Sequence, residues 1–199
     1  MAANTNDAII TLPGGIEVRP HHQEDAPSMS HHGNNRKIWD NLRDRMPHPY
    51  TLQDAEAWIK HCTDPANWPR SGKWTLEGGS EGPAIPASHV ISINGEVVGS
   101  IGLAFGEDVA RRSAEVGYWL GEEHWGKGVM SKVVPAYVQW AFKNFEILVR
   151  LNGETFEHNK WSESCLLKAG FVFEGRRAKK CFKNGEFVDT HEFGLLRPE

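Results

Sequence analysis

Two hydrophobic patterns alternate along the chain, one with the period of a strand and the other with the period of a helix. Alternating or continuously apolar runs predict strands, and apolar residues three or four positions apart predict helices. Strands and helices in the order found here predict a mixed α/β fold, part α + β, whose sheet is antiparallel at first. The expected strands are residues 16–20, 88–93, 97–105, 113–121, 147–151, one that begins at 171–173, and 187–196. The expected helices are residues 24–33, 37–45, 51–62, 126–144 and 159–169.

Turn and breaker residues mark the ends of several of these elements. Asn94-Gly95 and Asn184-Gly185 are two-residue sequences that favour tight hairpins between strands. Pro135 lies inside the longest helical pattern. Because proline has no amide hydrogen to donate, we expect a kink there.

Two helices are expected to begin at a side-chain cap and to bury one face. Thr51, with Asp54 three residues later, is a capping-box pattern, and Asn159 is a second good N-cap. The first of these helices is expected to bury Ala55, Trp58, Ile59 and Cys62. The second is expected to bury Trp161, Cys165 and Leu166.

Two stretches between the patterned segments are predicted to be loops. Residues 63–86 are rich in proline and glycine, and loops of this length are often functional. In residues 46–50 two prolines forbid a helix and hold His48 and Tyr50 rigidly. This second stretch is either the wall of a substrate site or a plain connection between helices.

Residues 113–131 carry the strongest chemical signal. A strand ending at Gly121 leads through a short loop, with Gly126 and Gly128, into a helix. Such a turn leaves backbone N–H groups free at the positive end of a helix dipole, which favours an anion. The glycines allow a phosphate close approach, and Lys127 could add a charge. The alternative is an ordinary tight turn, and the pattern fits neither a dinucleotide fold nor a P-loop.

Length, composition and charge favour one globular domain. The 199 residues, 39% of them hydrophobic, can form one substantial core, so we expect a single domain over 1–199 with its core at 16–196. A net charge of −4 argues against a nucleic-acid partner. The most basic run, residues 176–180, is expected to be a solvated strand edge.

Cysteines, histidines and apolar runs further limit the class of protein. Cys62, Cys165 and Cys181 are too few and too scattered for a disulfide framework or a zinc site, and Cys165 is expected in the core. The histidine pairs at 21–22 and 31–32 are expected on the solvated surface, so no metal is predicted. No apolar run reaches the ~18 residues of a membrane span and no signal peptide is recognisable, so a cytoplasmic location without membrane contact is expected.

Four short stretches occur together at a characteristic spacing. They are Ser113-Ala114-Glu115-Val116-Gly117-Tyr118-Trp119-Leu120, Trp125-Gly126-Lys127-Gly128-Val129-Met130, Asn159-x-x-Ser162 and Lys168-Ala169-Gly170-Phe171-x-x-Glu174-Gly175. With Pro47-x-Pro49-Tyr50-Thr51, this combination resembles the GNAT superfamily of acyl-CoA-dependent N-acetyltransferases over residues 16–196. The closest resemblance is to the branch that includes the bacterial ribosomal-protein N-terminal acetyltransferases. It implies a central mixed, mostly antiparallel sheet flanked by helices.

The resemblance also implies where acetyl-CoA, the cosubstrate, binds. The implied residues are Trp119, Leu120, Trp125, Gly126, Lys127, Gly128, Val129, Met130, Ser131 and Asn159. The family writes its pyrophosphate loop Q/R-x-x-G-x-G/A, and here Trp125 and Met130 depart from the first and last positions. Because backbone donors bind the phosphates, we still expect the loop to work, without the usual glutamine or arginine contact.

The catalytic residues implied by the resemblance are a base and an acid. Glu115 matches the glutamate base of several GNAT enzymes, and its alternative is a structural strand residue. Many members protonate the departing thiolate with a tyrosine, but Leu166 stands there. Ser162 matches the serine acid of the ribosomal branch, and its alternative is an ordinary first-turn serine.

The function predicted on these grounds is transfer of an acetyl group from acetyl-CoA to a primary amine. The acceptor is a protein N-terminus or a small molecule, an antibiotic included, and residues 46–50 and 66–86, with His48 and Tyr50, are expected to line its site. The alternative is a CoA-binding sensor or interaction module without turnover, suggested by Trp125 and Leu166. The oligomeric state stays open, a homodimer included.

Overall fold

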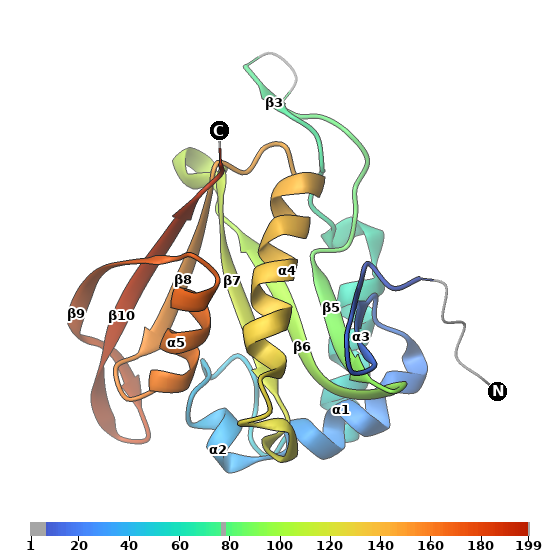
Figure 1. The fold of residues 1–199 in the computed structure, drawn as a ribbon, viewed down its shortest axis with the longest axis vertical. Coiled ribbons are helices and arrows are strands. Elements are labelled where there is room, and N and C mark those ends of the chain that lie inside the picture. Colours follow the sequence, from blue (N-terminus) through green and yellow to red (C-terminus); the bar gives the residue numbers. More distant parts are fainter. Residues whose placement is uncertain (1–6, 77–78, 199) are drawn as a thin grey trace.

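The protein is built on one eight-stranded sheet with helices on both faces (Figure 1). The computed structural model describes residues 7–76 and 79–198, so part of the predicted loop 63–86 lies outside the described residues. The strand order is β1-β2-β5-β6-β7-β8-β10-β9. Every neighbouring pair is antiparallel except β7 and β8, which are parallel. The predicted mixed, mostly antiparallel α/β fold is therefore confirmed.

The elements follow the predicted order, with three short additional strands. The strands are β1 (Ile10–Leu12), β2 (Ile16–Arg19), β3 (Trp74–Thr75), β4 (Gly79–Ser80), β5 (Ser88–Ile93), β6 (Glu96–Phe105), β7 (Ser113–Leu120), β8 (Arg150–Phe156), β9 (Val172–Lys183) and β10 (Glu186–Leu196). The α-helices are α1 (Ala26–Gly33), α2 (Arg36–Trp39), α3 (Leu52–Thr63), α4 (Val129–Asn144) and α5 (Lys160–Lys168). Single 3-10 turns lie at Gln23–Asp25, Pro65–Asn67, Asp108–Ala110 and Glu122–His124.

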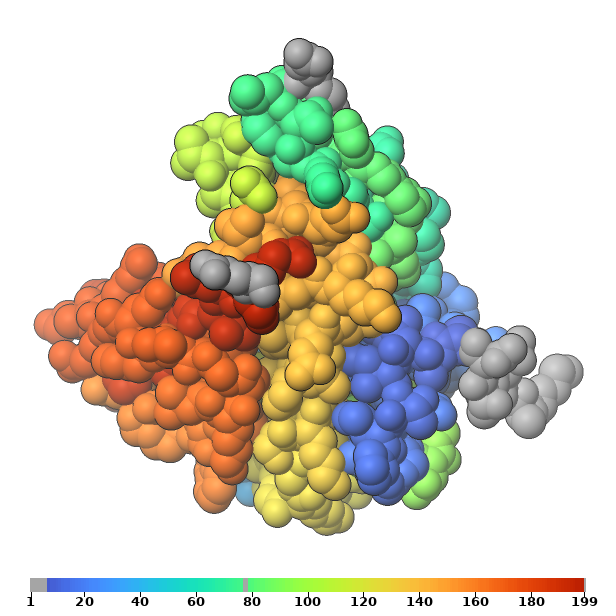
Figure 2. Space-filling view, turned by 45° about the horizontal axis from the view of Figure 1, so that its top comes forward, coloured from blue at the N-terminus to red at the C-terminus, as the bar shows by residue number. Residues whose placement is uncertain are grey.

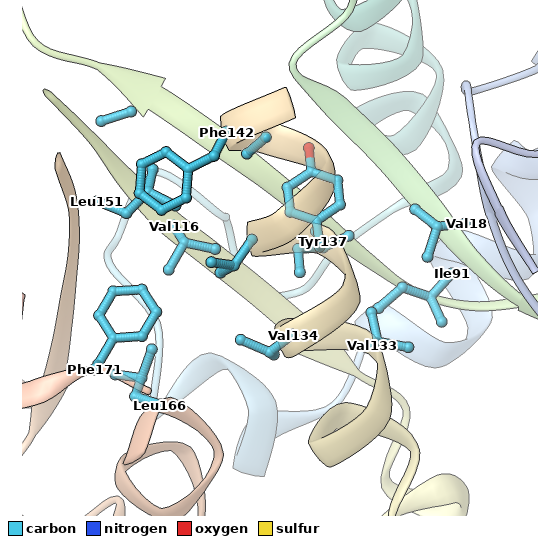
Figure 3. Close-up of a cluster of buried hydrophobic side chains, with 14 of the residues drawn as sticks. Val18, Ile91, Val116, Val133, Val134, Tyr137, Phe142, Leu151, Leu166 and Phe171 are labelled. Carbon is cyan, nitrogen blue, oxygen red and sulfur yellow. The ribbon is translucent and has the colours of Figure 1, made fainter. Parts of the chain in front are cut away.

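Two apolar cores lie on opposite faces of the sheet. The larger core joins the sheet to α4 and α5, and Figure 3 shows Val133, Val134 and Tyr137 of α4 within it. The smaller core joins the other face to α1 and α3, with Met29 and Ile59 among its fully buried members. Because removing apolar surface from water is the main favourable term in folding, these cores hold the central strands in place.

The predicted cap of α3 and the predicted hairpin turn at Asn94-Gly95 are confirmed. Thr51 Oγ1 accepts a hydrogen bond from the Asp54 N–H at 3.2 Å, and Asp54 Oδ2 accepts one from the Thr51 N–H at 2.9 Å, so α3 has the predicted cap. Asn94 and Gly95 have φ of 51° and 87°. Positive φ at both positions is the conformation of a two-residue hairpin turn.

The start of α4 lies three residues later than expected. Gly126 and Gly128 have φ of 71° and 73°, in the left-handed region that a right-handed helix excludes. The helix therefore begins at Val129. It is continuous through Pro135, so the proline does not end it.

Two other predicted elements are wrong in extent. The helix expected at residues 37–45 is only the single turn of α2, and residues 40–45 form turns and irregular chain. The strand expected at 147–151 begins at Arg150 and runs on to Phe156. Ile147 and Leu148 are buried before the strand begins, because the chain leaving α4 turns through the core there.

Two histidines expected on the solvated surface are buried. His21 and His32 are 4% and 6% exposed. Nε2 of His21 lies 3.1 Å from Ser88 Oγ, and Nε2 of His32 lies 2.9 Å from Glu96 Oε1. These partners, 67 and 64 residues away in the sequence, replace water at the Nε2 atom of each ring.

The helix α5 presents a different face to the core than expected. Leu166 is buried as predicted, but Trp161 is 81% exposed and Cys165 is only half-buried. Ser162 and Leu166, four residues apart, share one face of the helix. A Cβ placed on Gly153 of β8 would lie 2.8 Å from Leu166 Cδ1, so this face lies against the sheet.

The turn between β9 and β10 is bound to the segment around α2. Lys183 Nζ donates a hydrogen bond to Asp44 Oδ1 at 2.6 Å and lies 3.2 Å from the centre of the Trp39 ring. Asn184 Nδ2 donates to Asp40 Oδ1 at 2.8 Å. We call this group of contacts the hairpin clasp. It holds the segment between α2 and α3 against the last hairpin of the chain.

The remaining features lie away from the central strands. The β3–β4 hairpin projects from one end of the molecule (Figures 1 and 2). The strand β9 is the edge of the sheet, and residues 176–180 on it are exposed as predicted. No helix in the described part of the chain has the length and apolar character needed to cross a bilayer.

Candidate functional site

The strands β7 and β8 are neighbours that diverge along their length. Beyond Glu115, β7 continues to Leu120 and β8 to Phe156, with no further pairing between them in the described residues. The edge of β7 that faces β8 therefore carries backbone groups without a strand partner, which can bind the amides of a ligand. The pairs before the divergence are Ser113 with Arg150, Ala114 with Leu151 and Glu115 with Asn152.

A large cavity opens at this divergence. Its volume is about 1830 Å³, and it is lined by β7, β8, the start of α4, α5 and the segment between α2 and α3. Figure 2 shows the orange segment that contains α5 beside the yellow helix α4. A site for one drug-sized ligand has roughly 300–1,000 Å³. This cavity is therefore large enough for two reactants.

Strand alternation divides the lining of the cavity into two sides. Successive side chains of a strand point to opposite faces of the sheet. Tyr118 packs against the larger core, which includes α4 and α5, whereas Trp119 packs against the smaller core, which includes α1 and α3. In β8, Thr155 alternates with Glu154 in the same way. We call the two sides the α4–α5 side and the α2–α3 side.

On the α4–α5 side, the start of α4 is open. Its N-cap is Gly128, which has no side chain to bind the first N–H groups of the helix. A Cβ at Gly126 would have no heavy atom within 4 Å, and one at Gly128 would meet only Ser131 Oγ, at 3.5 Å. The free donors, the helix dipole and the open approach fit a phosphate group.

The side chain of Trp125 fixes the loop that precedes α4. Its Nε1 donates a hydrogen bond to the carbonyl of Leu120, the last residue of β7, at 2.7 Å. The tryptophan at this departure from the family pattern therefore ties the loop to the strand. This contact was not predicted from the sequence.

Two hydroxyl groups meet where β7 faces α5. Tyr118 Oη lies 2.9 Å from Ser162 Oγ and 3.2 Å from the Ser162 carbonyl oxygen. Burial raises the pKa of Tyr118 well above its usual value, and the hydrogen bond to Ser162 only partly opposes this. Asn159 Oδ1 accepts a hydrogen bond from the Ser162 N–H at 3.2 Å, so Asn159 is the predicted N-cap of α5.

On the α2–α3 side, the lining is charged. One nitrogen of Arg43, Nη2, lies 2.8 Å from Glu115 and 3.3 Å from Glu154 Oε1. Lys180 also binds Glu154. Burial lowers the pKa of Arg43, but its hydrogen bond to Glu115 and the two carboxylate charges outweigh this and raise it. Glu115 is therefore part of an ion-pair network at the mouth of the divergence.

Most of the site residues predicted from the sequence line this one cavity. They are Tyr50, Glu115, Trp119, Leu120, Trp125, Gly126, Gly128, Val129, Met130, Ser131, Asn159 and Ser162. Lys127 and His48 lie outside the lining formed by the described residues. His48 is exposed, with its ring 5.7 Å from that of Trp39. Tyr50 is buried in the smaller core, so it supports the cavity wall from behind.

Among the lining residues that the sequence analysis missed, four bear on the chemistry of the site. Tyr118 and Thr155 could have been found from strand alternation, since each faces α5 from a strand that reaches the divergence. Glu154 could have been found as the acidic counterpart of Glu115 on the next strand. Arg43 had no local signal, because it lies in irregular chain and reaches partners 72 and 111 residues away.

Leu166, which stands where many family members have a tyrosine, is part of the cavity wall. Leu166 lines the cavity but is 1% exposed, so its side chain serves mainly as core. Cys165 beside it also lines the cavity, and burial raises the pKa of its thiol. Among residues 7–76 and 79–198, no group of three or more His, Cys, Asp or Glu side chains is arranged to hold a metal ion.

Comparison with known proteins places this geometry in a family. The acetyltransferase (GNAT) domain matches residues 16–172. The uncharacterized N-acetyltransferase YoaA of Bacillus subtilis strain 168 is 34% identical over 103 residues. These residues are 52% of this chain and 57% of YoaA, so the chain spans little more than half of that relative's length.

Two solved structures share the fold at low sequence identity. The ribosomal-protein-S5-alanine acetyltransferase from Vibrio fischeri superposes with a TM-score of 0.75 at 20% identity, over 94% of this chain and 95% of that one. Mycobacterium smegmatis RimJ, in complex with CoA-disulfide, superposes with a TM-score of 0.73 at 19% identity, over 92% of this chain and 83% of that one. Since the domain match extends over most of the chain, the protein belongs to the GNAT acetyltransferase family.

Proposed function

We propose that this protein transfers an acetyl group from acetyl-CoA to a primary amine. One observation supports the proposal most strongly. The open start of α4 and the unpaired edge of β7 line the same cavity, so one ligand can use both. A long ligand with phosphates at one end and amides along its arm fits that arrangement, and CoA has both. RimJ, which has the same fold, binds CoA-disulfide.

Different segments would bind different parts of such a cosubstrate. The N–H groups after Gly128, with the helix dipole, would hold the pyrophosphate. The free edge of β7 from Gly117 to Leu120 would bind the amides of the pantetheine arm. A cosubstrate bound in this way would have its thioester at the divergence, between Ser162 on the α4–α5 side and Glu115 on the α2–α3 side.

The two sides then carry different parts of the chemistry. The attacking amine must lose a proton, and Glu115 is the proposed acceptor of that proton, directly or through water. The thioester carbonyl gains negative charge as the amine attacks, and backbone N–H groups of the unpaired β7 edge would stabilise it. Ser162 is the proposed hydrogen-bond donor to the departing sulfur.

The acceptor is proposed to enter from the α2–α3 side. Glu115 and Glu154 attract a cation there, and Arg43 occupies the point where both carboxylates converge. A primary ammonium is the matching charge. A protein N-terminus and a small amine both provide it, and the V. fischeri neighbour is named as an acetyltransferase of a ribosomal protein.

Calorimetric titration with acetyl-CoA tests the proposal directly. The native protein is expected to bind, and Gly128→Val to bind about 100-fold more weakly, because a β-branched side chain disfavours positive φ and covers the phosphate approach. Gly95→Val is the matched control, since Gly95 also has positive φ and open surroundings but lies in a hairpin outside the lining.

A panel of peptide N-termini and small amines then tests transfer. Glu115→Gln is expected to lower kcat about 10²–10⁴-fold while acetyl-CoA affinity stays unchanged. Binding without transfer to any amine would favour the alternative of a CoA-binding sensor. Absence of binding by the native protein would overturn the proposal altogether.

A further inference from the structure

Tyr118 and Ser162 form hydrogen bonds beyond the one that caps α5. Tyr118 extends from β7, after its pairing with β8 has ended, and its Oη reaches both the hydroxyl and the carbonyl oxygen of Ser162. Ser162 already has its backbone N–H bound by Asn159. The tyrosine therefore fixes the side chain of Ser162 at the cavity wall.

Each hydroxyl has one proton, and this limits the pair to two arrangements. If Tyr118 donates to the carbonyl oxygen of Ser162, the Ser162 proton can be donated to Tyr118 Oη and is turned away from the cavity. If Tyr118 donates to Ser162 Oγ, the Ser162 proton is free to point elsewhere. An anion in the cavity favours the second arrangement, because only then does Ser162 donate to it.

The surroundings keep the pair neutral. Burial raises the pKa of Tyr118, so its hydroxyl remains a donor across the physiological range. Leu166 and the half-buried Cys165 lie on the same helix. Thr155 Oγ1 is buried in the same lining and has no hydrogen-bond partner among the described residues. In such a weakly polar environment, a directed hydrogen bond is stronger than in water.

We propose that Tyr118 is a positioning residue that directs the hydroxyl proton of Ser162 toward the sulfur of bound CoA. This inference rests on the proposed function and goes beyond it, because it gives a role to the hydroxyl of Tyr118, which contacts Ser162. Tyr118 acts only through Ser162, by donating to its Oγ.

The sulfur receives a hydrogen bond in this scheme, not the serine proton. An alkyl hydroxyl is a much weaker acid than a thiol, which ionises near pH ~8.5, so transfer of the proton from serine is unfavourable. As the nitrogen–carbon bond forms and the carbon–sulfur bond breaks, the electron pair goes to the sulfur. The amine proton goes to Glu115 or water, and the thiolate is held by Ser162 until it leaves or takes a proton from solvent.

Binding of free CoA tests this inference without measuring turnover. Dissociation constants are measured for CoA and for desulfo-CoA, which lacks the sulfur, from about pH 7 to about pH 9.5. If Ser162 stabilises the thiolate, the preference for CoA over desulfo-CoA grows with pH. A one-unit fall in the pKa of the bound thiol makes this growth about tenfold.

Tyr118→Phe is the decisive variant. It keeps the ring and removes the hydroxyl, so the pH-dependent preference for CoA is expected to fall to within about twofold of its value at pH ~7, as in Ser162→Ala. Tyr137→Phe is the matched control and is expected to keep the native behaviour, because Tyr137 and its hydrogen-bond partner His89 lie outside the cavity lining formed by the described residues. Desulfo-CoA affinity is expected to be unchanged in Tyr118→Phe.

Two outcomes would overturn the inference. One is a pH-dependent preference in Tyr118→Phe equal to that of the native protein. The other is a preference in the native protein that does not change with pH. Both leave acetyl transfer intact, whereas failure of the proposed function would appear as no binding of CoA or desulfo-CoA at any pH.

Discussion

The two sides of the cavity are built in different ways. On the α4–α5 side the groups proposed to bind the ligand are neutral: the hydroxyls of Tyr118 and Ser162 and the backbone donors at the start of α4. On the α2–α3 side they are charged, with Arg43 between Glu115 and Glu154. The first side depends on burial and directed hydrogen bonds, and the second on paired charges near solvent.

The difference extends to how each side is assembled along the chain. The α4–α5 side comes from residues 113–168, where consecutive elements pack on one another. The α2–α3 side joins Arg43 to partners 72 and 111 residues away. Packing should therefore set the stability of the first side, whereas charge should set the ligand preference of the second. The following changes test that contrast.

Leu166→Ala should have the largest effect, on stability. Leu166 is 1% exposed and contacts Gly153, so its truncation should lower the free energy of unfolding by about 2–5 kcal/mol. Leu167→Ala is the control, because Leu167 is 48% exposed and its loss should cost less than about 1 kcal/mol. Urea unfolding of both variants measures the difference. Equal losses in the two would contradict a packed α4–α5 side.

Acid should destabilise the protein through two buried histidines. Burial lowers the pKa of His21 to about 4 and that of His89 to about 3. Below pH ~6.5 the unfolded chain binds protons that these folded side chains do not, so stability falls as the pH falls. The expected slope is about 1.4 kcal/mol per pH unit for each histidine, until the folded pKa is reached.

Urea unfolding at several values between about pH 7 and pH 5 measures this slope. His21→Gln keeps a polar side chain but cannot bind the proton, so its slope should be shallower by about 1.4 kcal/mol per pH unit. A variant with the slope of the native protein would show that His21 is not a source of the acid sensitivity.

Asn159→Ala should have an intermediate effect on the α4–α5 side. Loss of the N-cap of α5 should lower the free energy of unfolding by about 1 kcal/mol. Asn159→Ser keeps a capping oxygen and should retain most of this stability. If both variants bind CoA equally weakly, Asn159 also contacts the ligand. If only Asn159→Ala binds CoA weakly, Asn159 contributes to CoA binding only by capping α5.

Arg43→Ala should have the smallest effect on stability. Arg43 is 56% exposed, so loss of its ion pairs should change the free energy of unfolding by at most about 1 kcal/mol. Acetyl-CoA affinity should stay within about twofold, since Arg43 is on the other side of the cavity. The KM of a cationic acceptor should fall about two- to threefold at low salt, because Glu115 loses the Arg43 charge and Glu154 keeps only Lys180. The effect should fade with added salt.

The control for this change is Arg43→Lys, which retains the positive charge. Its KM for the acceptor should stay near that of the native protein. A rise in KM for Arg43→Ala would mean that Arg43 binds the acceptor and does not compete with it.

The α4–α5 side, which consecutive elements form, could be predicted from the sequence better than the α2–α3 side, which distant residues form. The strand β7, the glycine loop and the cap of α5 depend on neighbouring residues, and the sequence pattern places all three to within a few residues. Trp161 was misplaced because hydrophobicity alone assigned the inner face of α5, although the polar Ser162 lies on that face and leads into a cavity.

Other residues were misjudged or missed because their partners are distant in the sequence. His21 and His32 are polar residues whose burial depends on groups more than 60 residues away, at Ser88 and Glu96. The position of Arg43 depends on three strands that come later in the chain. No local pattern can contain that information, since the partners are chosen only when the sheet has formed.

The hairpin clasp sets an order for folding during synthesis. The chain emerges from the ribosome N-terminal end first, and the segment around α2 is made some 140 residues before Lys183 and Asn184. Contacts across so long a loop form slowly, because closing the loop costs entropy before the contact forms. The segment between α2 and α3 therefore gains these contacts only after the turn between β9 and β10 has been translated, when every other element of the sheet up to β9 has already been made.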